Sequence, residues 1–287
     1  MNFSSVTILS PAKVNLALHI TGQDVQTGYH YLDSTVCFPH WGDFLTFTPS
    51  NQLSLKVKGG TDDIPEGDDN LIIKAYHILC EAVQKDLPKM HIHLTKNIPS
   101  QAGLGGGSSN AATCLLVWQK LFLPDLSLED LTPIALKIGA DVPVCLYRQS
   151  CLMKGYGEDI TPLPQTGITY YMILAKPQKG ANTHNIFTQL ASRNNPALSN
   201  NIPLDKLAQH SLQNGRNDLA PAAKINTPDI ENIHTTFEKS NAIKYDVTGS
   251  GSASFALFDN KISVQKTLKI LNQKMPDIFT VQTKVIL

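Results

Sequence analysis

The sequence predicts an α+β protein of two domains, because helical and strand patterns both occur and do not alternate in the regular order of a doubly wound sheet. Residues 70–84 carry apolar side chains at the spacing of an amphipathic helix, whereas residues 90–96 alternate apolar and polar side chains as a strand does. The length of 287 residues suffices for two ordinary domains. Two prolines and a glycine within 162–167 indicate the connection, which divides the chain into domains 1–161 and 162–287.

The same patterns predict the other elements in chain order. Asp43–Thr48 and Leu53–Lys58 alternate on either side of a short polar break, which is typical of a β-hairpin. Ser127 and Asp130 have the spacing of a capping box, and Gly139 is placed to end the helix that they begin. Further helices are expected at 109–121, 183–192, 229–239 and 261–274. Further strands are expected at 7–10, 14–20, 142–146, 150–154, 170–175, 245–248, 254–257 and 279–285.

Composition and charge exclude several classes of function. The 24 basic residues balance the 24 acidic ones, so no strong basic field recruits nucleic acid. No stretch approaches the roughly 18 apolar residues of a membrane span, and the N-terminus does not have the pattern of a signal peptide. The five cysteines are dispersed, which indicates reduced thiols rather than a metal site or a disulfide framework. We therefore expect a cytoplasmic protein with no metal-ligating cluster, no nucleic-acid or membrane partner and no sequence signal for an oligomeric state.

The most informative segment is a glycine-rich loop between an expected strand and an expected helix. Four of the five residues 103–107 are glycines, which permit backbone conformations closed to other residues and a close approach by a ligand. Ser108 and Ser109 follow where the helix begins and where unpaired N–H groups attract phosphate. The loop has neither the Lys of a P-loop nor the glycine spacing of a Rossmann fingerprint. A flexible linker would not run abruptly from strand to helix, so the loop favours a nucleotide-using enzyme.

Three polar residues lie in apolar surroundings near expected turns. Lys13 and Asn15 are two apart in an apolar strand and therefore share a face. A lysine there either faces a cavity with a partner or reaches solvent from an edge strand. Asp141 follows a helix terminator and precedes an apolar strand, where it either projects into a cleft as a base or bonds its own turn.

Two further loops carry possible ligand contacts. Residues 247–253 form a second Gly/Ser loop between strands, which is either an anion-binding nest or an ordinary hairpin. Gly28, Tyr29 and His30 combine a turn glycine with two rings, which either bind a flat ligand or simply cover the turn.

In this order and at these spacings, the segments together resemble the GHMP kinase superfamily. The resemblance spans nearly the whole chain, in the stretches PAKVNLALHITG (11–22), GYH (28–30), IPSQAGLGGGSSNAA (98–112), IGADVPV (138–144), NDL (217–219) and TGSGSASFALF (248–258). It implies a two-domain GHMP kinase fold with the active site in the cleft between the domains. It also implies an ATP-dependent kinase of isoprenoid precursor biosynthesis.

The resemblance implies a role for each candidate residue. The acceptor would be a cytidine diphosphate ester of methylerythritol (CDP-methylerythritol), whose 2-hydroxyl receives the phosphoryl group. Lys13 and Asp141 would be catalytic, with Asp141 as the general base. ATP, arriving with Mg²⁺, would lie with its phosphates along Pro99, Ser100, Gln101, Ala102, Gly103, Leu104, Gly105, Gly106, Gly107, Ser108 and Ser109. The substrate would be bound by Asn15, Tyr29, His30, Thr183, Phe187, Gly249 and Ser250, with the rings of Tyr29 and Phe187 stacked on the cytosine and His30 at its edge.

The chain departs from the family pattern at two places near these sites. Asp24 and Thr27 precede Gly-Tyr-His where relatives often have Arg and Asp, which changes the support of that turn. Asn110 stands where many relatives have Asp, so a helix-capping side chain remains but a negative charge is lost.

Two other functions are compatible with parts of the sequence. A kinase of the same fold could act on mevalonate, homoserine or a sugar, but the rings of Tyr29, His30 and Phe187 favour a pyrimidine. A ligand-binding relative without activity would not need Lys13 and Asp141.

Overall fold

The computed structural model describes residues 4–60 and 63–287, which form two compact units, each assembled from separate parts of the chain. The first unit contains the chain up to Ala12 together with 41–100 and 105–148. The second contains 13–40, 101–104 and 149–287. The glycine-rich loop therefore contributes residues to both units. The predicted division into 1–161 and 162–287 is a different division from these two units, and it stays a prediction.

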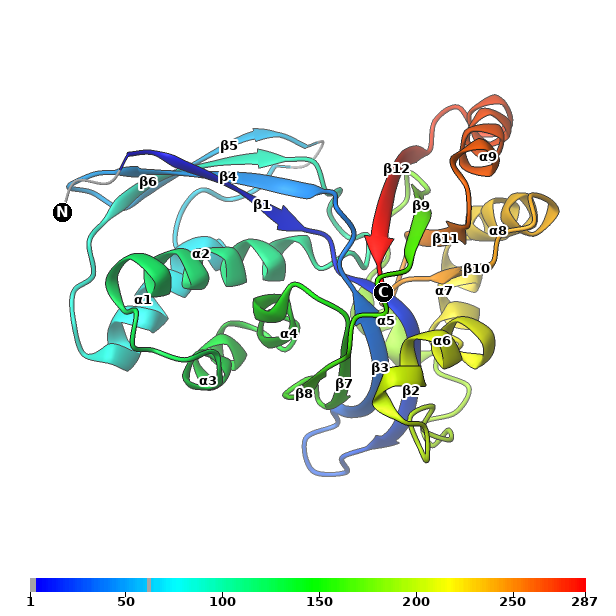
Figure 1. Cartoon of the computed structure of the whole chain (residues 1–287), viewed down its shortest axis with the longest axis horizontal. Helices are drawn as coiled ribbons and strands as arrows, with labels where there is room; N and C mark the ends of the chain where they lie inside the picture. The colour runs from blue at the N-terminus through cyan, green and yellow to red at the C-terminus, as the bar shows by residue number, and fades with distance from the viewer. Residues whose placement is uncertain (1–3, 61–62) are drawn as a thin grey trace. The chain divides into compact units, whose positions relative to one another are not determined.

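The first unit is a four-stranded sheet with helices along one face (Figure 1). The strand order is β1-β4-β6-β5, and every pair is antiparallel except β5 with β6. The parallel pair is connected through a helix, α1, as such a crossover requires. The strands are β1 (Val6–Pro11), β4 (Gly42–Pro49), β5 (Ser54–Gly59) and β6 (Met90–Lys96). The helices are α1 (Leu71–Val83), α2 (Gly106–Phe122), α3 (Leu128–Ile138) and α4 (Val142–Tyr147).

The predicted hairpin of 43–48 with 53–58 is wrong, although both strands form. Strand β6 lies between them, so Leu45 is paired with Leu94 and Leu55 with Ile92. Alternation of apolar and polar residues defines a strand but not its partner. The inserted strand β6 alternates regularly and has one fully buried face, but this pattern does not say which strands flank it.

The core of the first unit forms between the sheet and its helices. The ring of Trp118 lies edge-on to Phe47, with ring centroids 5.9 Å apart, and its indole N–H donates to the carbonyl of Pro88. The capping box of Ser127 and Asp130 is present at the start of α3, as predicted. The strand predicted at 142–146 is wrong because these residues form α4. All five are buried, so the apolar run showed no period that separates strand from helix.

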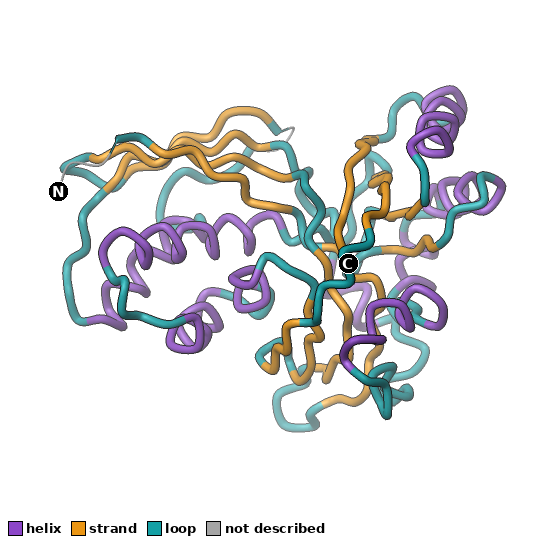
Figure 2. The backbone as a smooth tube through the Cα atoms, in the orientation of Figure 1, coloured by secondary structure: helices purple, strands orange, loops and turns teal. Residues whose placement is uncertain are grey.

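The second unit contains two four-stranded sheets with five helices in its described residues (Figure 2). The first sheet has the order β2-β3-β7-β8, from β2 (Val14–Gln23), β3 (His30–Cys37), β7 (Cys151–Gly155) and β8 (Asp159–Pro162). The second has the order β10-β11-β9-β12, from β9 (Thr169–Lys176), β10 (Lys244–Val247), β11 (Ser254–Phe258) and β12 (Phe279–Ile286). The helices are α5 (Thr183–Thr188), α6 (Leu204–Asn214), α7 (Ala220–Asn226), α8 (Asp229–Lys239) and α9 (Lys261–Lys274).

Two apolar clusters form the core of the second unit. One joins β2 to α5, α7 and β10, and includes Leu18, Ile20, Ile186 and Val247. The other lies between β9, β11 and the pair α8 and α9. The helix predicted at 183–192 ends early, since α5 closes at Thr188. Helices α6 and α7 were missed, although Leu204, Leu207, Ala208 and Leu212 have helical spacing in α6. Helix α7 has only seven residues, too few for a clear period.

Two general expectations are also addressed by the fold. All five cysteines carry free thiols, and Cys80 is the one that is partly exposed. No helix within residues 4–60 and 63–287 combines the length and apolar character that crossing a membrane requires.

Candidate functional site

The glycine-rich loop enters α2 with free backbone donors. Helix α2 begins at Gly106, three residues before its predicted start, and Gly105 caps it in the left-handed conformation at φ 63°. The N–H groups of Gly106, Gly107 and Ser108 precede the first intrahelical bonds. They donate to no acceptor among the described residues. The first turn holds no acidic residue, so the donors and the helix dipole are oriented to bind an anion.

A buried polar network supports this loop inside the first unit. Asp43 accepts hydrogen bonds from the Lys96 ammonium and from the side-chain amide of Asn110, each at 2.9 Å. Asp43 also accepts the backbone N–H groups of Asn97 and Ile98 at 2.7 and 2.8 Å. The strand that leads into the loop and the helix that leaves it are therefore bonded to one carboxylate. The amide of Asn110 serves this network, a role that its position in the motif did not predict.

Asp141 lies at the N-terminus of α4, and its side chain does not cap that helix. At the other end of α4, Arg148 donates to the Thr113 hydroxyl at 2.7 Å. Thr113 in turn donates to the carbonyl of Ser109, at 2.8 Å. The helix that carries Asp141 is thus bonded to the first turns of α2.

Lys13 and Asn15 are both buried in the second unit, at 3% and 1% exposure, so Lys13 does not reach solvent from an edge strand. The Lys13 N–H donates to the carbonyl of Leu104, which ties this segment to the glycine-rich loop. The Asn15 amide donates to Ser34 at 2.8 Å, and its backbone N–H donates to Thr248 at 3.0 Å. Asn15 Oδ1 is buried and accepts no hydrogen bond from the described residues. A buried acceptor of this kind favours a ligand that brings a donor, such as a hydroxyl.

Two glycine-containing segments of the second unit pack directly on one another. The backbone N–H of Ala253 donates to Ala102 at 3.0 Å. Gly103 has φ +71°, and a Cβ there would lie 2.2 Å from the carbonyl oxygen of Thr248. Only glycine fits where the backbone of residue 103 comes this close to the carbonyl of Thr248. The part of the glycine-rich loop in this unit is therefore fixed by the second Gly/Ser loop.

The second Gly/Ser loop has the properties of an anion nest. Gly249 adopts φ +56°, and the consecutive N–H groups of Gly249 and Ser250 have no acceptor in the described chain. The hydroxyls of Ser250 and Thr183 lie 2.9 Å apart, so these two predicted substrate residues do meet.

The predicted aromatic site is partly assembled. The rings of His30 and Phe187 lie against each other, with centroids 5.0 Å apart. His30 Nε2 is buried and has no hydrogen-bond partner among the described residues. Burial lowers the pKa of His30, and the charge of Arg193 lowers it further, so the neutral ring prevails near pH 7. Tyr29 is 67% exposed, and its ring is edge-on to Tyr156.

Sequence reasoning missed the support of this aromatic turn. Tyr156 donates to the Asp24 carboxylate at 2.6 Å, and its ring is stacked on that of Tyr31. The other oxygen of Asp24 accepts the backbone N–H groups of Gln26 and Thr27. The hydrogen bond from Tyr156 is the largest cause that lowers the pKa of Asp24. Asp24 with Tyr156 therefore fixes the turn that carries Tyr29 and His30.

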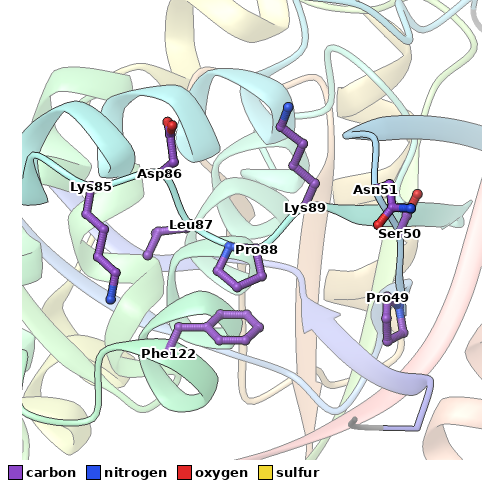
Figure 3. Close-up of a pocket in the computed structure, with 9 residues that line it drawn as sticks. All are labelled: Pro49, Ser50, Asn51, Lys85, Asp86, Leu87, Pro88, Lys89 and Phe122. Carbon is purple, nitrogen blue, oxygen red and sulfur yellow. The ribbon is translucent and has the colours of Figure 1, made fainter. Parts of the chain in front are cut away.

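The predicted site residues are divided between the two units. Those in the first unit are Pro99, Ser100, Gly105–Ser109 and Asp141. Those in the second are Lys13, Asn15, Tyr29, His30, Gln101–Leu104, Thr183, Phe187, Gly249 and Ser250. A pocket of about 660 Å³ in the first unit is lined instead by 49–51, 85–89 and Phe122 (Figure 3). None of the predicted site residues lines it.

Family comparisons agree with the fold and the loops. Residues 70–149 match the family described as the GHMP kinases N terminal domain, and residues 196–277 match GHMP kinases C terminal. The fold and the glycine-rich loop thus define a kinase of the GHMP class. A 4-diphosphocytidyl-2-C-methyl-D-erythritol kinase from Rhizobium etli is 36% identical over 283 residues, covering 98% of this chain and 95% of the relative. The same kinase from Brucella melitensis is 36% identical, with 96% and 94% covered. The chain belongs to this family of 4-diphosphocytidyl-2-C-methyl-D-erythritol kinases.

Solved structures give the same assignment at the level of fold. A crystal structure of 4-(cytidine 5'-diphospho)-2C-methyl-D-erythritol kinase has a TM-score of 0.81 and 26% identity, covering 98% of this chain and 99% of the other. Homoserine kinase from Cytophaga hutchinsonii has a TM-score of 0.73 at 18% identity, covering 99% and 95%. The homoserine kinase likeness shows a shared fold only. The α+β fold of a GHMP kinase is therefore confirmed.

Proposed function

We propose that this protein transfers the γ-phosphoryl group of ATP to the 2-hydroxyl of 4-(cytidine 5'-diphospho)-2-C-methyl-D-erythritol, a step in making isoprenoid precursors. The observation that carries the proposal is the 36% identity to kinases of that name over nearly the whole chain. The buried, unpartnered Nε2 of His30 beside the Phe187 ring supports a flat heterocycle with a hydrogen-bonding edge as part of the substrate.

The proposed roles follow from what each group can do. The free N–H groups of Gly106, Gly107 and Ser108 bind the phosphates of ATP and neutralise charge as the phosphoryl group is transferred. Asn15 Oδ1 accepts a hydrogen bond from a substrate hydroxyl. Asp141 takes the proton of the attacking 2-hydroxyl. Lys13 stabilises the negative charge that develops on that oxygen.

Mg²⁺ would enter this proposal as part of the ATP complex, where it would offset the negative charge of the phosphates. The described residues hold no group of three or more His, Cys, Asp and Glu side chains that fits a metal ion. The donors of the glycine-rich loop are N–H groups, which bind the anion rather than the cation. In this proposal the loop binds the phosphates of the MgATP complex.

The experiment is a coupled assay of purified protein with ATP, Mg²⁺ and the cytidine substrate. The expected result is one ADP for each phosphorylated product, with the new phosphate on the 2-hydroxyl by ³¹P and ¹³C NMR. Mevalonate and homoserine serve as comparison acceptors, because kinases for them share this fold. Turnover of either one without turnover of the cytidine substrate would contradict the proposal.

A further inference from the structure

The Asn-Asp-Leu segment at 217–219 lies against strand β2, and the roles proposed above do not use it. The Leu18 N–H donates to the carbonyl of Arg216 at 2.8 Å, and the Asp218 N–H donates back to the carbonyl of Leu18 at 2.9 Å. Asp218 also accepts the N–H of Ile20 at 2.8 Å. The segment is thus fixed to the strand that carries Asn15.

From this fixed segment, Asn217 reaches the second Gly/Ser loop. Its side-chain amide donates to two carbonyls, those of Val247 and Gly249, each at 2.8 Å. Its Oδ1 accepts the N–H of Leu219 at 2.9 Å, and its own N–H donates to Asp246. Asn217 is 4% exposed. Both donors of a buried amide are therefore used to hold backbone carbonyls of one loop.

The direction of these carbonyls determines the direction of the N–H groups that follow them. In a trans peptide the C=O and the next N–H point in opposite directions. The carbonyl of Val247 faces Asn217, and the N–H of Thr248 points away and closes the loop on Ala253 at 3.0 Å. The carbonyl of Gly249 also faces Asn217, so the N–H of Ser250 points away from this contact. That N–H donates to no described residue.

We infer that Asn217 is a positioning residue, which holds the Gly249–Ser250 peptide so that its N–H binds a phosphate of a nucleoside diphosphate group. This inference rests on the proposed function for the identity of that group, which is either the diphosphate of the cytidine substrate or the phosphates of ATP. An aspartate at 217 has the same shape but presents carboxylate oxygens to two carbonyl oxygens. The Gly249–Ser250 peptide then rotates, and the N–H of Ser250 no longer points toward the phosphate.

The test compares Asn217→Asp with the control Asn226→Asp in the full-length protein. The Asn226 side-chain amide also donates to two acceptors in the second unit, Ala222 and Gln189, but it does not contact the loop. Dissociation constants are measured by NMR titration for CDP, cytidine, ADP and adenosine. We expect Asn217→Asp to raise the dissociation constant of CDP about tenfold or more and that of cytidine less than twofold. This is the effect that the loss of one charge-assisted hydrogen bond predicts. Asn226→Asp leaves all four unchanged.

The remaining outcomes decide between the ligands and against the inference. If ADP binding is weakened more than adenosine binding while CDP binding is unaffected, the positioning role is supported and the Gly249–Ser250 peptide is assigned to the phosphates of ATP. If the binding of nucleosides and of nucleoside diphosphates is weakened equally, Asn217 has only a structural role and the inference is overturned. Asn217→Ser is measured in every case, because it retains one donor and adds no charge that would itself repel a phosphate. It is expected to show the same selectivity at smaller size, and no selectivity in this variant overturns the inference. If the wild type binds CDP selectively through Asn217 but does not phosphorylate the cytidine substrate, the proposed function fails and this inference stands.

Discussion

Asp43 and Lys96 form a buried ion pair, with the Lys96 ammonium 2.9 Å from Asp43 Oδ2 and side-chain exposures of 0% and 7%. The pair joins the start of β4 to the end of β6. The same carboxylate accepts the Asn110 amide, so the N-terminal part of α2 is bonded to it as well. The pair therefore sets the position of the glycine-rich loop relative to the sheet of the first unit.

Replacing Asp43 by Asn is expected to destabilise the protein by about 3–5 kcal/mol, because it leaves the Lys96 ammonium buried without its carboxylate. Urea unfolding followed by tryptophan fluorescence measures the change. The double variant Asp43→Asn with Lys96→Met is expected to lose less than the sum of the single losses, since both charges are removed together. Additive losses would show that the pair is not energetically coupled.

Asp141→Asn is expected to lower kcat by about 10²–10⁴-fold, the usual range when a general base is removed. The KM for ATP should change little, since Asp141 lies at α4 and not in the loop that carries the free amides. Steady-state kinetics with both substrates varied separates the two constants. Near-normal turnover would remove Asp141 from the chemistry.

Tyr156→Phe is expected to raise the KM for the cytidine substrate several-fold while kcat and the KM for ATP stay close to wild type. The change keeps the ring stacked on Tyr31 and removes the 2.6 Å hydrogen bond to Asp24 that braces the turn with Tyr29 and His30. The control is Tyr170→Phe, whose hydroxyl lies 3.5 Å from Gln209 in the same unit. A similar KM for the cytidine substrate in both variants and the wild type would show that the hydrogen bond from Tyr156 to Asp24 does not support substrate binding.

Stability is expected to fall below neutral pH because of His234. Burial lowers the pKa of His234 to about 4 from an ordinary value near 6.5, and Lys224 adds to the effect. Between these two values the unfolded chain binds more protons than the folded one, so stability decreases as pH falls through this window. This group alone accounts for roughly 2 kcal/mol between pH 7 and pH 5.

The check is urea unfolding of His234→Gln across that pH range. Glutamine can keep a hydrogen bond with Ser254, which lies 3.0 Å from His234 Nε2, but it does not titrate. The variant should lose less stability than the wild type from pH 7 to pH 5. An unchanged slope would assign the acid sensitivity to other groups.

Local features of the sequence predicted most elements and several site residues. Helix α9 was predicted with its observed bounds, and the structure adds that the Asn260 side chain caps its N-terminus. Lys13 and Asn15 were found because polar residues in an apolar strand need a reason to be buried. The local pattern did not predict which strands pair, because β6 lies between the two strands that were expected to form a hairpin.

The supporting contacts could not be predicted because they join residues distant in sequence. Tyr156 meets Asp24 across 132 positions, and Asn15 meets Thr248 across 233. Each of these residues is ordinary in its local context. The Asn217 motif was visible as part of the family pattern, but its function required the positions of the carbonyls that it binds.

The discontinuous make-up of the second unit has a practical consequence for dissecting the protein. A fragment that starts at Gln149 would keep β7 without its partner strand β3, and would uncover the apolar side chains that Leu18 and Ile20 shield. It would also lack residues 101–104, on which the second Gly/Ser loop packs. No single truncation point yields the second unit intact, so nucleotide binding must be studied with the full-length chain.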